Sequence, residues 1–264
     1  MKKQHVRLTI LVIILLLKCS YGQNLNSWEI FSRTHGIKQE TTTFYEVEDY
    51  SIFVQIHKNK FDEKGINKVK RMYAIGKELI PITDSTLQPC NIYVTSEVRT
   101  KNVTQTNVYY ILPQGLNEIK VIGLQTTNLR NEELEKFMVK AILINSIPKE
   151  SYTTMAIESI NFAGRDIKLG NACHWMKPHN IQCSNLGQMN WAEFGNIERA
   201  KKMIECQMDI TENKNSGTVL KKDTVDIVFE GNGTKALKMI FKVNVPELLW
   251  AGSNVLVIYY VATN

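Results

Sequence analysis

Short segments in which apolar and polar residues alternate recur along this chain, and they constrain its fold more than any other feature. Side chains of a β-strand point alternately to the two faces of a sheet, so this period predicts strands with one buried and one polar face. The segments lie at 42–57 (two strands), 90–98, 106–112, 117–124, 154–162, 165–170, 224–230, 235–245 and 253–262. The glycine-flanked Asn232 between two of them indicates a hairpin turn. Most of the chain is therefore expected to form antiparallel sheets.

Three further segments have the period of an amphipathic helix. Residues 63–80 precede Pro81, and residues 130–148 end at Pro148, where proline stops a helix. Asn131 is the expected N-cap of the second helix, with acidic residues in the favourable first turn. Residues 196–210 place their apolar side chains on one face. The fold class predicted by this mixture is α+β.

The two halves of the chain repeat one order of elements. Each reads as two strands, a helix and three strands, so we expect two similar ββαβββ-type subdomains, 23–150 and 151–264, with mostly antiparallel sheets packed against helices. One continuous α+β domain is the alternative. The first half adds a closing helix that the second lacks. The last strand is therefore expected to pair inside its sheet or to offer an edge to another chain, unless the second subdomain is incomplete at its C-terminus.

The first 22 residues have the layout of a secretory signal peptide. A basic start precedes ten apolar residues at 8–17, and the small residues Ser20 and Gly22 stand just before Gln23. The apolar run is too short to span a bilayer, and no later run approaches the roughly 18 residues that a span needs. An uncleaved anchor and a lipidated Cys19 are the alternatives. We expect a secreted or periplasmic protein with no transmembrane segment after signal removal.

Net charge argues against a polyanionic partner. The whole chain has 32 basic and 26 acidic residues, but four of the basic ones lie in the signal segment, which leaves a formal charge of +2 on the remainder. A nucleic-acid-binding domain usually carries a strong basic excess. Nucleic acid is therefore not an expected partner.

The stretch 171–191 is the least regular part of the sequence and holds two cysteines, two histidines and two tryptophans. An exported chain with the four cysteines Cys90, Cys173, Cys183 and Cys206 is a candidate for disulfides. A bond between Cys173 and Cys183 would close a loop of about ten residues and is the favoured pairing. Cys206 is expected to be a packed thiol or a partner for Cys90.

Two chemical alternatives for this stretch stay open. Cys173, His174, His179 and Cys183 are residue types that bind zinc, although adjacent cysteine and histidine residues are poor zinc spacing. A cysteine could also act as a nucleophile beside His174 or His179, but no family signature surrounds it. No nucleotide-binding or hydrolase motif occurs elsewhere, and we expect no cofactor.

The remaining large residues of the stretch have two possible roles. Trp175, Met176, Pro178, Met189 and Trp191 are either core residues or a recognition surface for a protein or a small apolar ligand. Core packing is the simpler interpretation of the tryptophans. Loops of this length in compact domains are often functional, however, and this keeps the recognition hypothesis open.

These observations lead to a hypothesis about function that rests on no catalytic motif. We expect a non-catalytic binding protein of the cell envelope or extracellular space whose partner is another protein there. A metal- or thiol-dependent enzyme that uses residues 171–191 is the alternative. Asn102 and Asn232 begin glycosylation sequons that matter only in a eukaryotic secretory pathway. The sequence leaves the oligomeric state open.

Overall fold

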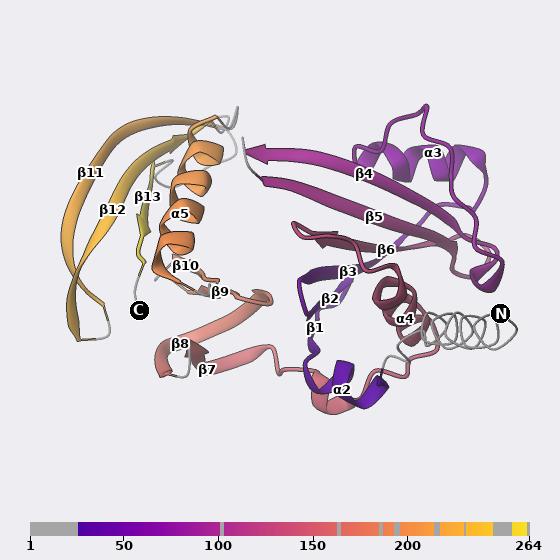
Figure 1. The fold of residues 1–264 in the computed structure, drawn as a ribbon, viewed down its shortest axis with the longest axis horizontal. Helices are drawn as coiled ribbons and strands as arrows, with labels where there is room; N and C mark the ends of the chain where they lie inside the picture. The colour runs from indigo at the N-terminus through magenta and orange to yellow at the C-terminus, as the bar shows by residue number, and fades with distance from the viewer. Residues whose placement is uncertain are drawn as a thin grey trace, which may run out of the picture.

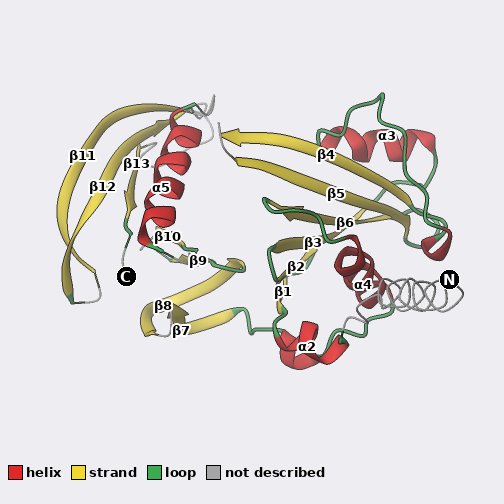
Figure 2. Ribbon diagram, viewed as in Figure 1, coloured by secondary structure: helices red, strands yellow, loops and turns green. Residues whose placement is uncertain are grey.

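The computed structural model describes residues 26–100, 103–162, 165–184, 187–192, 196–213, 217–229, 231–244 and 255–262. Within them the protein is a mixed α+β structure whose sheets are antiparallel, as predicted (Figures 1 and 2). The expected signal peptide and the sequon residue Asn102 lie outside the described residues. No helix in the described ranges is long and apolar enough to cross a membrane.

The first half forms one six-stranded sheet with the order β1-β2-β3-β6-β5-β4. Its strands are His35–Lys38 (β1), Thr42–Val47 (β2), Tyr50–His57 (β3), Asn91–Thr100 (β4), Val103–Pro113 (β5) and Ile119–Thr126 (β6). The pairing of β3 with β6 joins the strands before the first long helix to those after it. Five successive residues of β5, from 108 to 112, are buried, so both faces of the sheet are covered there.

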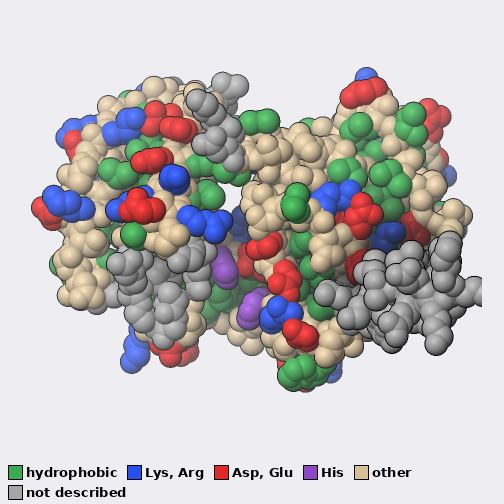
Figure 3. All heavy atoms as spheres, viewed as in Figure 1, with side chains coloured by type: hydrophobic (Ala, Val, Ile, Leu, Met, Phe, Trp, Pro, Cys, Tyr) green, Lys and Arg blue, Asp and Glu red, His purple; other side chains and the backbone are tan. Residues whose placement is uncertain are grey.

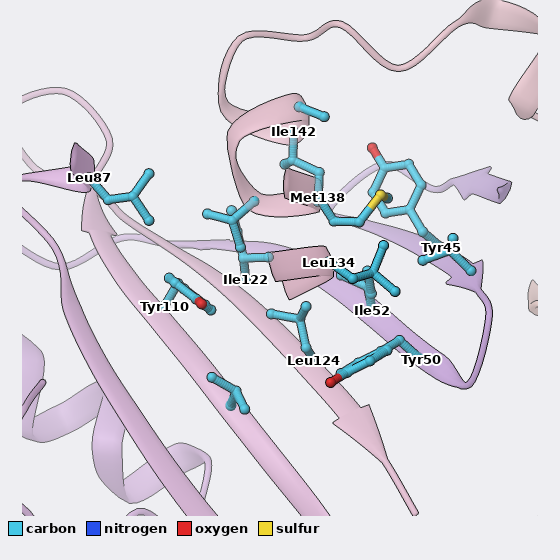
Figure 4. Packing of buried hydrophobic residues seen from close by; sticks show 14 of the residues in the cluster. Tyr45, Tyr50, Ile52, Leu87, Tyr110, Ile122, Leu124, Leu134, Met138 and Ile142 are labelled. Carbon is cyan, nitrogen blue, oxygen red and sulfur yellow. The ribbon is translucent and has the colours of Figure 1, made fainter. Parts of the chain in front are cut away.

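Two helices supply that cover from opposite sides. Val108, Tyr110 and Leu112 of β5 pack with α4 (Glu132–Leu143), whose Leu134 and Met138 point into the same core (Figure 4). The alternate residues Tyr109 and Ile111 belong to a second core with α3 (Glu63–Met72). Because alternate side chains of a strand face opposite ways, the two helices lie on opposite faces of the sheet.

Several sequence-based boundaries need correction. Asn131 caps α4 as predicted, accepting from the Leu134 N–H at 3.1 Å. The predicted helix 63–80 instead ends at Met72, and Ala74 adopts a left-handed φ of 52°. Ile80, the last residue of the predicted helix, is 86% exposed. The short elements α2 (Ser27–Ser32) and β1 were not predicted. Two 3₁₀ turns, Ser85–Leu87 (η1) and Lys149–Ser151 (η2), complete this half.

The described residues of the second half form two separate sheets and one helix. The four strands ordered β10-β9-β8-β7 are Ala156–Phe162 (β7), Arg165–Lys177 (β8), Asn180–Cys183 (β9) and Gly187–Asn190 (β10). Helix α5 (Ile197–Glu212) follows, and then the sheet β11-β12-β13, formed by Gly217–Phe229, Asn232–Val243 and Val255–Tyr260. Figure 1 shows α5 beside this last sheet, and the Thr211 and Tyr260 hydroxyl groups lie 3.1 Å apart.

The order of elements in the second half is close to the predicted one, but its strand pairing differs from that of the first half. Among the described residues, no pairing joins the sheet before α5 to the sheet after it, whereas β3 and β6 make that connection in the first half. The last strand, β13, pairs with β12. The expectation of two similar subdomains stays a prediction.

Candidate functional site

Most of the described residues of the stretch 171–191 form strands rather than the predicted irregular loop. The predicted strand 165–170 continues as β8 to Lys177, turns back at residues 178 and 179, and returns as β9 and then β10. We call residues 171–184 and 187–191 the stapled hairpin. Register shifts in β8 interrupt its alternation opposite both β7 and β9, which explains why the sequence did not read as a strand.

A disulfide between Cys173 and Cys183 closes the hairpin, as predicted. The two residues lie directly opposite each other in the pairing of β8 with β9, and both are buried. Neither sulfur is a free thiolate in this state, so the zinc set proposed with His174 and His179 is not assembled. No group of three or more suitable side chains in the described ranges could hold a metal ion.

The other two cysteines are separate buried thiols. Cys90 packs in the core beneath α4, and Cys206 lies on the buried face of α5. The alternative bond between them is therefore absent from the structure. Burial raises the pKa of the Cys90 thiol to about 12. A thiol with that pKa is almost wholly protonated at neutral pH and is a poor nucleophile.

One face of the hairpin is apolar and includes the disulfide. Trp175 and Met189 flank Ile181 in register, and these side chains pack with the two cysteines and Trp191 in one cluster. The ring centroids of Trp175 and Trp191 lie 5.7 Å apart. Within the described chain, the Trp175 indole N–H is buried without a hydrogen-bond partner. Most of the predicted recognition residues therefore take part in this cluster.

The tip of the hairpin is more open. Met176, one of the predicted recognition residues, is 40% exposed, whereas Pro178 is buried. Pro178 and His179 form the turn between the paired residues Lys177 and Asn180. His179 adopts a φ of 54°, so this is the pattern of a type II turn, with proline second and a left-handed residue third.

The His179 side chain links the turn to two other parts of the molecule. Its ring stacks on Trp191 with centroids 5.4 Å apart and an interplanar angle of 21°. The backbone N–H of Trp191 donates to the His179 carbonyl at 3.1 Å. Its Nε2 lies 3.4 Å from Oε2 of Glu46 on β2. The side chain of Gln39, one residue after β1, donates to the Met176 carbonyl at 2.7 Å.

The stapled hairpin thus contacts the edge of the six-stranded sheet. Figure 3 shows histidine side chains close to acidic ones near the middle of the molecule. Sequence reasoning missed Glu46 and Gln39. Both lie more than a hundred positions before the hairpin, and no motif surrounds either of them. An imidazole beside a carboxylate still needs a nucleophile within reach for nucleophilic catalysis. The two hairpin cysteines are joined to each other and cannot serve.

The sequon residue Asn232 is exposed at the start of β12. It follows Gly231, whose φ is 80°, in the turn between β11 and β12. This is the hairpin predicted from the glycine-flanked asparagine. The position is open enough to carry a glycan in a host that glycosylates exported proteins.

Comparison with known proteins identifies no family. No family model matches the chain, and no curated protein matches it. A crystal structure at 1.50 Å resolution from Bacteroides thetaiotaomicron VPI-5482 is 8% identical, covers 78% of this chain and 80% of its own, and superposes with a TM-score of 0.28. A likeness at that level carries no argument about fold or function.

Proposed function

We propose that this is an exported, non-catalytic binding protein, secreted or periplasmic, which contacts another protein of the envelope or extracellular space through the stapled hairpin. The observation that carries the proposal is the disulfide within the aromatic cluster. A cross-linked hairpin is ordered before it binds, so a partner does not have to supply the free energy of ordering it. A signal peptide, as predicted from the sequence, would export the protein to a compartment where a disulfide persists.

The surface of the hairpin suits an apolar contact. Trp175 and Trp191 are only partly buried, and Met176, which follows Trp175 in the chain, is exposed. Tryptophan and methionine are enriched at the centres of protein interfaces because they bury a large apolar area. Methionine also adapts its shape to a partner at small cost. We therefore expect the partner to present apolar or aromatic side chains to this tip.

A photo-cross-linking amino acid at position 176 tests the proposal in the native host. The matched control is the same substitution at Leu116, which is 94% exposed in the turn between β5 and β6. We expect position 176 to give a discrete adduct with one envelope or extracellular protein, and position 116 to give none. Met176→Glu in the untagged chain should abolish its competition for that adduct, and Leu116→Glu should not.

The result that contradicts the proposal is equally concrete. If positions 176 and 116 give the same pattern of adducts, the hairpin tip is not the contact surface. An intact disulfide in each variant, measured by mass spectrometry without reduction, shows that the comparison concerns folded hairpins.

A further inference from the structure

We propose that the Pro178–His179 turn is a latch, in which the His179 side chain holds the stapled hairpin against β1 and β2 through Glu46. The argument begins with the backbone. A residue with a φ of 54° occupies the left-handed region, in which a non-glycine residue is strained. Glycine or asparagine is the usual residue at this place in a type II turn. Histidine is therefore not the residue that the turn itself favours.

The contacts of the imidazole explain why histidine stands there. Its Nε2 lies 3.4 Å from the Glu46 carboxylate. Glu46 belongs to the six-stranded sheet, whereas the hairpin belongs to the four-stranded sheet. The stack on Trp191 fixes the plane of the ring, so that the nitrogen points to Glu46 without a search among rotamers. Neither glycine nor asparagine could make both contacts.

A second, independent contact lies further along the same pair of strands, because Glu46 is opposite His35 whereas Gln39 follows Lys38. Gln39 donates its side-chain amide to the Met176 carbonyl at 2.7 Å, so the hairpin is held at the turn and again on the strand before it. Glu46 lies on β2, and Gln39 directly follows β1, the strand that is paired with β2. Two points of attachment fix the orientation of the hairpin as well as its distance from the sheet.

The latch has a consequence for recognition that rests on the proposed function. It fixes the direction in which Met176 and the partly buried rings face, relative to the edge of the first sheet. The existence of the latch does not depend on a partner. It can therefore be tested on the isolated full chain, and its failure is distinguishable from failure of the binding proposal.

Quantitative lysine cross-linking measures the latch directly. Lys38 and Lys177 are exposed neighbours of the residues that make the second contact, so a short amine-reactive reagent should join them in the full-length protein. The cross-link between Lys221 and Lys238, which lie diagonally across β11 and β12, serves as the internal reference. The variants are Glu46→Ala, which removes the carboxylate, and His179→Asn, which keeps a residue that tolerates a left-handed backbone.

We expect both variants to lower the yield of the Lys38–Lys177 cross-link roughly threefold relative to the reference, as suits the loss of one partly exposed polar contact. Gln188→Ala is the matched control, because it removes a hydrogen bond to Asn180 within the hairpin and leaves the latch intact. Its yield should equal that of the unchanged protein. An unchanged yield in Glu46→Ala, or a loss of equal size in Gln188→Ala, would overturn the proposal. Unreduced mass spectrometry confirms the disulfide in every variant.

Discussion

Removal of the staple tests how far the disulfide orders the hairpin. The double variant Cys173→Ala, Cys183→Ala deletes the bond without placing an unpaired hydroxyl group in a buried cluster, as serine would. The two residues are separated by 10 positions. The chain-entropy relation then gives a loss of about 2.5 to 3 kcal/mol.

That loss should appear as local opening rather than as unfolding of the whole chain. The hairpin belongs to a small cluster with residues of β7 to β10, whereas the large cores belong to the six-stranded sheet. Such a region can open by itself, and amide hydrogen exchange then reports its own free energy of opening. A change of 2.5 to 3 kcal/mol corresponds to roughly a hundredfold faster exchange.

Hydrogen exchange followed by mass spectrometry measures the exchange rates of β9 and β5 in one experiment. Peptides covering β9 should exchange about a hundredfold faster in the double variant, by the tenfold-per-1.4-kcal/mol relation. Peptides covering β5 should keep the rate of the unchanged protein. Acceleration of less than about threefold in β9 would show that the strand pairing alone orders the hairpin. Equal acceleration in β5 would show that the two regions unfold together.

Three further predictions concern buried groups of the first half. Glu135 is fully buried and accepts a hydrogen bond of 2.7 Å from the Arg130 guanidinium. Glu135→Ala should therefore lower the free energy of unfolding by about 3 to 5 kcal/mol in denaturant titration, and Glu135→Gln should lower it by less. Burial lowers the pKa of His57 below its ordinary 6.5, so the unfolded chain binds more protons there and stability should fall as pH drops below 6.5; His57→Gln should remove that part of the pH dependence. The buried Cys90, with its pKa raised to about 12, should resist alkylation at pH 8 until the chain is unfolded, as mass spectrometry of the treated protein can show.

The sequence predicted elements that are long enough to show several periods, and it missed short ones. Alternation over eight or more residues revealed β3 and β12, and Asn131 with its acidic neighbours located the start of α4. Elements as short as β1 do not complete enough periods to stand out from chance. The end of α3 was misplaced because Ile75 and Leu79 continue the apolar period after the backbone has left the helix at Ala74.

Lys70 shows a second limit. A lysine in an amphipathic helix is expected on the solvated face, yet Lys70 is buried in the structure. Its ammonium group donates to the carbonyls of Lys77 and Leu79 and lies 4.7 Å from the centre of the Tyr93 ring. These partners exist only because the helix ends at Met72 and the chain turns back beside it. Residue type alone therefore could not assign this side chain to the interior.

The candidate site was predictable in its covalent part and not in its tertiary part. Export, an even number of cysteines after the predicted signal peptide and a short spacing pointed to the bond between Cys173 and Cys183. The contact of His179 with Glu46 depends on how the hairpin meets another sheet, and no spacing rule reaches across that distance. The left-handed φ of His179 was also hidden, because proline followed by histidine does not identify a type II turn as proline followed by glycine would.

The difference in strand pairing between the two halves has a physical reason that can be read back into the sequence. Residues 108–112 and 119–124 are nearly continuous apolar runs, which is typical of strands covered on both faces. β5 and β6 can therefore lie at the centre of a sheet with α3 on one face and α4 on the other. β11 and β12 instead place Lys222, Asp226 and Lys235 between their apolar residues, which is typical of a sheet with one covered face. A second helix on that sheet would have to desolvate those charges. Similar order along the chain therefore does not require similar pairing, because the side chains between the apolar positions decide how many layers a sheet can accept.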